Sequence, residues 1–139
     1  SLGNIAKCGR RPFEGLVAYG EAPPRPGLWA MDAAAYAPES VTGFVLAGAQ
    51  VVLFTTGVGN SYASALAPTL KLTANPETCA ASGGLLDFDA STAFTGAQSM
   101  GAAALGLRRR LLEIASGRAT WGEILGEGDE VLSRYEVAL

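Results

Sequence analysis

The most informative feature of the hydrophobic pattern is residues 40–70, a stretch without any formal charge in which short apolar runs alternate with glycine and polar residues. Its central run, residues 50–56, is apolar on both faces, as in parallel strands that are covered by helices. Gly57 and Gly59 follow this run directly. In open α/β sheets ligands bind beyond the carboxyl ends of the strands, and free amides of a glycine turn can hold an anion. The pattern therefore predicts a central strand that ends in an anion-binding turn.

The rest of the chain alternates between strand and helix patterns. Apolar runs predict further strands at 13–19, 28–31 and 69–73, with 85–89 as either strand or turn. Proline, capping residues and apolar spacing predict helices from Pro38 to Gly48, around 61–67, from Asn75 to Gly83, over 98–116 and from Thr120 to Gly126. In the long helix, we expect Leu105, Leu111, Leu112 and Ala115 to share one side. This alternation predicts a three-layer α/β fold with a mostly parallel sheet.

Composition narrows the classes of protein that the chain can represent. Its 139 residues, 49% of them hydrophobic, are expected to form a single α/β domain over residues 1–139. The net charge of −3 and the absence of a basic face argue against a nucleic-acid partner. Glycine, asparagine and proline interrupt the uncharged stretch, which argues against a membrane span. With no secretory pattern at the start and two cysteines expected to be reduced, we expect a cytoplasmic protein.

The chain contains no histidine, which excludes every catalytic scheme that needs one. Gly57 and Gly59 match two positions of a dinucleotide fingerprint, but Tyr62 stands at the third, so the nucleotide signal is weak. Lys71 interrupts an apolar strand pattern. It either protects a solvent-exposed edge strand or presents an ammonium group to an acidic substrate.

Two further polar positions also allow two readings. Asn75 precedes Pro76 and is expected to cap the following helix, and it can also contribute to an anion site. Asp87 and Asp89 alternate, so on an extended segment both carboxylates would face one side. Such a pair suits a hard divalent cation, although paired aspartates are also common in solvated turns.

Several segments resemble, in chain order, the C-terminal part of the altronate and galactarate dehydratases, a family of sugar-acid dehydratases. The similarity covers nearly the whole chain, and its segments are 1–9 (SLGNIAKCG), 15–32 (GLVAYGEAPPRPGLWAMD), 38–59 (PESVTGFVLAGAQVVLFTTGVG), 67–78 (APTLKLTANPET) and 86–90 (LDFDA). The most specific parts are the Phe-Thr-Thr-Gly turn, the Lys71-to-Asn75 spacing and the aspartate pair. Val58 stands where the relatives usually have arginine, and losing a guanidinium removes a bidentate carboxylate ligand.

The resemblance implies a Rossmann-like unit that belongs to a longer hydro-lyase and converts a sugar acid to a 2-keto-3-deoxy acid. It implies a divalent metal, iron(II) or manganese, that is ligated largely by an upstream region. This chain would act together with that region and would be inactive without it. The implied site residues are Lys71 as the catalytic residue, Thr55, Thr56, Gly57, Gly59 and Asn75 for the substrate carboxylate, and Asp87 and Asp89 for the metal. We also expect a homo-oligomer. The alternatives are a non-enzymatic anion-binding or assembly module and part of a related sulfo-lyase.

Overall fold

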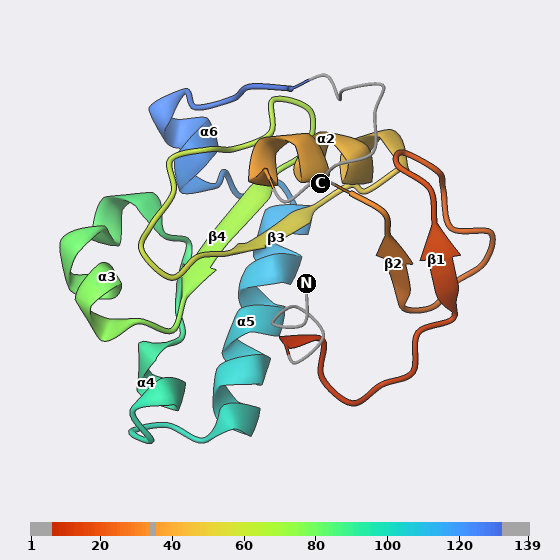
Figure 1. The fold of residues 1–139 in the computed structure, drawn as a ribbon. Helices are drawn as coiled ribbons and strands as arrows, with labels where there is room; N and C mark the ends of the chain where they lie inside the picture. The colour runs from red at the N-terminus through yellow and green to blue at the C-terminus, as the bar shows by residue number, and fades with distance from the viewer. Residues whose placement is uncertain (1–6, 34–35, 132–139) are drawn as a thin grey trace.

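The computed structural model describes residues 7–33 and 36–131, in which short parallel strands form two separate sheets (Figure 1). The smaller sheet contains β1 (Gly15–Val17) and β2 (Trp29–Met31), and the larger contains β3 (Val52–Thr55), β4 (Thr69–Thr73) and β5 (Phe88–Asp89), in the order β3-β4-β5. Every pairing is parallel. The predicted strands are therefore confirmed in position, although β1 and β3 are shorter than their apolar runs.

Local sequence signals explain where the helices begin and end. The helices are α2 (Ala37–Leu46), α3 (Pro76–Ala81), α4 (Ser91–Phe94), α5 (Met100–Ala115) and α6 (Trp121–Leu125), with a 3₁₀ turn η1 (Gly83–Leu85). Ser99 caps α5 by accepting the amide of Ala102. Thr120 and Glu123 form the predicted capping box of α6, which ends at Gly126 in the left-handed conformation. The caps place both helices where the sequence predicted them.

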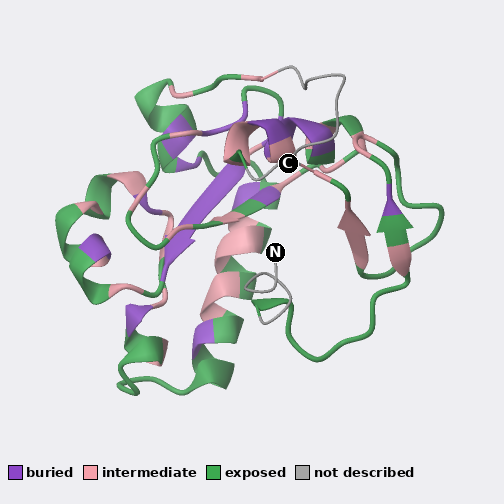
Figure 2. Ribbon diagram, in the orientation of Figure 1, coloured by how far each residue is buried: buried purple, intermediate pink, exposed green. Residues whose placement is uncertain are grey.

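Three layers are built around β4, which is buried along its whole length (Figure 2). On one face, Val52 of β3 packs with Val41 of α2. On the other face, Leu70 and Leu72 of β4 pack with Ile114 of α5. Because successive strand residues point to opposite faces, the sheet separates an α2 layer from an α5 layer. The predicted α/β fold class is confirmed.

Three details of the prediction are wrong. The central strand is β4, and β3 lies at an edge of its sheet, so Leu53 remains 47% exposed. Residues 61–67 form no helix, because the hydroxyl of Ser64 accepts the amides of Leu66 and Ala67 in a compact turn. The buried side of α5 carries Ala103 and Ile114 instead of the predicted leucine side.

No helix among residues 7–33 and 36–131 is both long and apolar enough to span a membrane.

Candidate functional site

A pocket of about 690 Å³ lies at the carboxyl ends of β3, β4 and β5. Thr55 and Thr56 reach it from the end of β3, Thr73 from the end of β4, and Ala90 from the residue after β5. Among the predicted substrate-binding residues, Thr55, Thr56, Gly57 and Asn75 line this pocket, and Gly59 does not. The parallel sheet thus brings most of the predicted binding residues together at the edge where α/β proteins bind ligands.

The glycine turn is held by the start of α3. The side-chain amide of Asn75 donates to the Gly57 carbonyl at 3.0 Å, and the Thr78 hydroxyl donates to the same oxygen at 2.8 Å. The other end of the Asn75 side chain accepts the amide of Glu77, so the predicted N-cap is confirmed. Gly59 has a φ of +90°, which few other residues adopt. Asn75 therefore positions the turn as well as capping the helix.

The charges around the pocket are few and of both signs. Lys7 supplies an ammonium group and Glu77 a carboxylate, and both line the pocket. The hydroxyl groups of Thr55 and Thr56 add neutral donors next to them. Val58, between Gly57 and Gly59, is 88% exposed, and its side chain has no polar group. The lining residues thus include hydroxyl-bearing side chains and one ammonium group, which are the kinds of group that bind carboxylates.

Lys71 lies away from this pocket, with its side chain fully buried beneath the sheet. Its Nζ donates to the Glu127 carboxylate at 2.6 Å and to the Ser61 carbonyl at 3.1 Å. The edge-strand alternative for Lys71 is wrong, because β4 is the middle strand of its sheet. A buried ammonium group is tolerated when it is paired, and Glu127 provides that pairing. The catalytic role of Lys71 stays a prediction.

The carboxylate of Asp87 joins two parts of the backbone. One oxygen accepts the amide of Lys71 at 2.9 Å, and the other accepts the amide of Trp121 at 2.8 Å, in the first turn of α6. Both oxygens are therefore occupied by backbone donors, and Asp87 ties α6 to the central strand. The sequence suggested that the Asp87 and Asp89 carboxylates face one ligand together. In the structure the two carboxylates have separate hydrogen-bond partners within the chain.

Asp89 accepts hydrogen bonds from the Cys79 thiol at 2.9 Å and from the Ser91 amide at 2.7 Å. These donors stabilise the carboxylate and hold the pKa of Asp89 below its usual value, with the thiol as the largest cause. Burial, followed by the hydrogen bond to Asp89, raises the pKa of the Cys79 thiol. Cys79 is a free thiol, as the sequence predicted.

The donor set does not fit a divalent metal held by this chain alone. Among the described residues, no three side chains of histidine, cysteine, aspartate or glutamate come together as a metal site. The two oxygens of Asp87 already serve backbone amides. Hard divalent cations need six or more oxygen ligands, including water, and the described chain does not gather them.

Two acidic residues near the end of the described chain were missed by the sequence reasoning. Glu127 pairs with Lys71, and Glu130 accepts the hydroxyl of Thr42 at 2.7 Å, the hydroxyl of Ser64 and the amide of Ala65. Both carboxylates bind groups that lie more than 50 residues earlier in the chain. No local sequence pattern identifies such pairs. A lysine within an apolar strand pattern nevertheless indicates that an acidic partner is needed if the lysine is buried.

The family model for the C-terminal region of D-galactarate/altronate dehydratases matches residues 1–138. The chain belongs to this dehydratase family. The predicted resemblance is thereby confirmed, and it rests on nearly the full length of the chain.

Individual members of the family and its relatives differ in the reaction they are named for. The chain is 38% identical to the (2R)-sulfolactate sulfo-lyase subunit beta of Chromohalobacter salexigens, over 99% of this chain and 36% of that protein. It is 32% identical to the galactarate dehydratase (L-threo-forming) of Escherichia coli, over 85% of this chain and 23% of that enzyme. The altronate dehydratase of Escherichia coli is 31% identical, over 88% of this chain and 24% of that enzyme. The chain thus spans about a third or less of these relatives.

Proposed function

We propose that this chain is the C-terminal part of a hydro-lyase that dehydrates a sugar acid of the altronate or galactarate kind to a 2-keto-3-deoxy acid. One observation carries the proposal. In a chain of the galactarate and altronate dehydratase family, the pocket at the carboxyl ends of all three strands of the larger sheet is lined by Thr55, Thr56 and Gly57, which are hydroxyl- and amide-bearing residues suited to a carboxylate. In this proposal the pocket holds the substrate carboxylate.

The proposed reaction needs little more from this chain than binding and orientation. A base removes the proton next to the carboxylate, the resulting enediolate expels the β-hydroxyl group as water, and the enol product becomes the 2-keto acid. The hydroxyl groups of Thr55 and Thr56 and the ammonium group of Lys7 would donate to the carboxylate, where negative charge increases in the enediolate. Asn75 would keep the turn in place through the Gly57 carbonyl.

The proton-transferring base lies outside the described pocket in this proposal. The chain has no histidine, and the ammonium group of Lys71 is occupied by Glu127 and the Ser61 carbonyl. We therefore assign Lys71 a structural role in this proposal. We assign no metal to this chain, since Asp87 serves backbone amides. In this proposal the enzyme is cytoplasmic and homo-oligomeric. Its remaining region supplies the base and the ligands for any iron(II) or manganese.

A binding experiment tests the proposed carboxylate site. Titration of the chain with galactarate or altronate, followed by NMR, should shift the amide resonances of Thr56 and Gly57. The variant Thr56→Val should weaken binding severalfold, because a hydroxyl donor to a charged acceptor is lost. Thr92→Val, outside the pocket, is the control and should bind unchanged. Shifts located elsewhere, or unchanged binding by Thr56→Val, would remove the pocket from the proposal.

An activity assay separates the enzyme from a plain anion-binding module. We expect the isolated chain to release no 2-keto product from galactarate or altronate with ferrous or manganous ion present. The complete enzyme should release it. Turnover by the isolated chain would show that its own residues suffice, and a complete protein that binds sugar acids without turnover would favour the module.

A second candidate, part of a sulfo-lyase that acts on sulfolactate, is favoured by the 38% identity to the Chromohalobacter salexigens subunit over 99% of this chain. Sulfolactate also carries a carboxylate, so the same pocket would serve. A sulfonate replaces the β-hydroxyl as the leaving group, and sulfite would be released. Competition between (2R)-sulfolactate and galactarate at the Gly57 amide, together with a sulfite assay on the complete enzyme, distinguishes the two reactions.

A further inference from the structure

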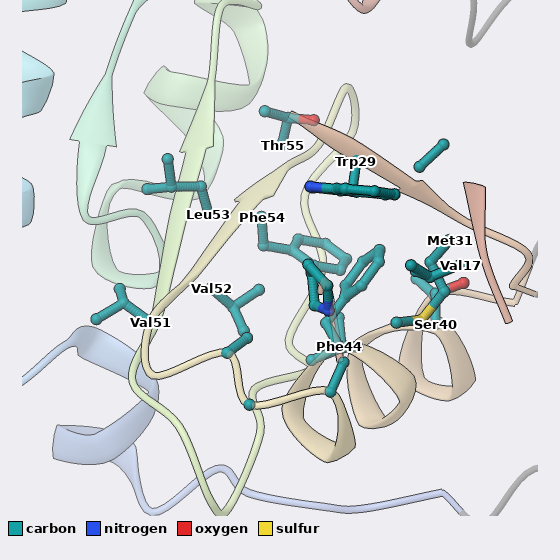
Figure 3. A pocket seen from close by; sticks show the side chains of 17 residues that line it. Val17, Trp29, Met31, Ser40, Phe44, Val51, Val52, Leu53, Phe54 and Thr55 are labelled. Atoms are coloured by element: carbon teal, nitrogen blue, oxygen red, sulfur yellow. The ribbon is translucent and has the colours of Figure 1, made fainter. Parts of the chain in front are cut away.

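A second and larger hollow lies between the two sheets, on the side of β3 that faces away from β4. This groove has a volume of about 810 Å³ and is lined by β2, by β3 and by the apolar side of α2 (Figure 3). Across the molecule the strands follow the order β1, β2, β3, β4, and the groove separates β2 from β3 (Figure 1). Within the described residues, no strand pairing joins the two sheets.

Both walls of the groove present unpaired strand edges. On β3, the amide of Val52 donates to the carbonyl of Pro68, just before β4, at 2.9 Å. The amide of Thr56 donates to the carbonyl of Leu72 in β4 at 3.0 Å. Because alternate residues of a parallel strand point their backbone groups to opposite sides, Leu53 directs its amide and carbonyl into the groove. An unpaired edge of this kind is a template for another strand.

The same alternation holds on β2. The amide of Asp32 donates to the Val17 carbonyl of β1 at 3.0 Å, so the neighbouring Met31 directs its backbone groups toward the groove. A two-stranded sheet such as β1-β2 has little stability by itself. One strand placed between β2 and β3 would satisfy both edges and convert the two sheets into one.

The size and chemistry of the groove agree with one strand. A strand residue occupies about 160 Å³ in a layered sheet, taken as about 3.3 Å along the strand, about 4.8 Å between strands and about 10 Å between layers. The groove therefore accommodates about five residues, close to the four residues of β3. Its floor is apolar, and Phe44 of α2 is still 40% exposed there. A helix or a small apolar molecule could fill the space but would leave the backbone groups of both walls unpaired.

We propose that the groove between β2 and β3 binds one extended strand in which alternate residues are apolar. This strand is supplied by the part of the enzyme that corresponds to the region of the longer relatives not aligned with this chain. The length of the relatives supports this source, because the chain spans 36%, 23% and 24% of them. The inserted strand would pair with both edges and lay its apolar side chains on α2. This inference goes beyond the proposed function and does not depend on which acid is the substrate.

Strand insertion is tested with peptides and amide exchange. The probes are overlapping peptides of about 12 residues, long enough to contain one strand, that cover the unmatched part of the Chromohalobacter salexigens sulfo-lyase subunit beta. One peptide should slow hydrogen exchange of the Leu53 and Met31 amides about tenfold or more, which corresponds to about 1.4 kcal/mol of added protection. The Phe54 amide, which already faces β4, is the internal control.

Three variants separate loss of peptide binding from loss of folding. Leu53→Pro removes the amide that points into the groove and should abolish peptide binding, while Leu53→Ala keeps that amide and should retain most of it. Should Leu53→Pro disturb the fold, Phe44→Lys places a charge on the exposed floor and should also abolish binding. Protection of Leu53 that instead increases with the concentration of the chain alone would identify a second copy as the occupant. That result, or the absence of any protecting peptide, would overturn the proposal.

Discussion

The buried ion pair between Lys71 and Glu127 gives the sharpest prediction about what holds this chain together. Their charged atoms lie 2.6 Å apart, the lysine side chain is fully buried and the glutamate side chain is 22% exposed. Replacing Glu127 by glutamine leaves the ammonium group buried without a counter-charge. Removal of one partner from a buried pair costs about 3–5 kcal/mol, and the partial exposure of Glu127 places the expected loss near about 3 kcal/mol.

Removing the lysine should cost less than removing the glutamate. In Lys71→Met, an apolar chain of similar length fills the buried space, and the Glu127 carboxylate can be hydrated from its exposed side. We expect a loss of about 1–2 kcal/mol, and the double variant should be about as stable as Lys71→Met alone. Urea unfolding measures each value. With a slope of about 1.5 kcal/mol per molar urea, Glu127→Gln should lower the midpoint by about 2 M.

A matched control comes from an exposed pair in the same chain. Glu113 lies 2.8 Å from Arg118 and 3.4 Å from Arg110. Because Glu113 and Arg118 are well exposed, Glu113→Gln should cost less than about 0.5 kcal/mol. Additive losses in the Lys71 and Glu127 variants would refute a coupled pair. If Lys71→Met instead weakened galactarate binding and left the free energy of unfolding unchanged, Lys71 would belong to the ligand site, as the sequence reasoning predicted.

Further predictions concern three single positions. Gly59→Ala should lower the free energy of unfolding by about 1–2 kcal/mol, because its φ is +90°, whereas Gly57→Ala, with open space around its Cβ position, should cost little in the same urea assay. Thr120→Ala should cost about 1–2 kcal/mol through loss of the α6 cap, and Thr120→Ser should restore most of it. Asp89→Asn removes a carboxylate that raises the pKa of the Cys79 thiol, so alkylation of Cys79 by iodoacetamide, followed by mass spectrometry, should reach half its maximal rate at a lower pH. The pKa of Asp89 is lowered in the folded chain, so the ionised carboxylate stabilises the fold at pH values above the pKa of the unfolded chain. This stabilisation is lost as the pH falls through the pKa of the folded chain, and the difference in unfolding free energy between the parent and Asp89→Asn should vanish below that pH.

Local signals predicted most of the elements because their causes lie within a few residues. Asn75 and the Thr120 capping box specify helix starts through hydrogen bonds to the first turn, and Pro76 contributes its fixed φ at the first helical position. The structure has both starts at those positions. Strand order depends on pairing between distant segments. The apolar run at residues 50–56 resembles a central strand, yet only the pairing of β4 with both β3 and β5 decides that β4 occupies the centre.

The candidate site divides in the same way. Thr55, Thr56, Gly57 and Asn75 could be predicted because the carboxyl end of a strand and the following turn are adjacent in the sequence. Lys71 lies on β4, four residues before Asn75, and Asp87 immediately precedes β5, yet neither lines the pocket. Each instead binds a group from α6 or from the residues after it. Family resemblance identified these positions as important, and it could not tell support of the fold from contact with a substrate.

The two groups of polar residues are linked through the central strand. Lys71 and Thr73 lie two residues apart on β4 and therefore point to the same face, with Lys71 anchored to Glu127 and Thr73 at the pocket. Asp87 accepts the amide of Lys71 and so fixes β5 against β4 just before both strands reach the pocket. Although Lys71 does not line the pocket, its ion pair can then still influence the position of Thr55 and Thr56, since β3 pairs with β4. Substitutions at Lys71 or Asp87 that impair a complete enzyme would therefore be expected to lower its stability and its substrate affinity together.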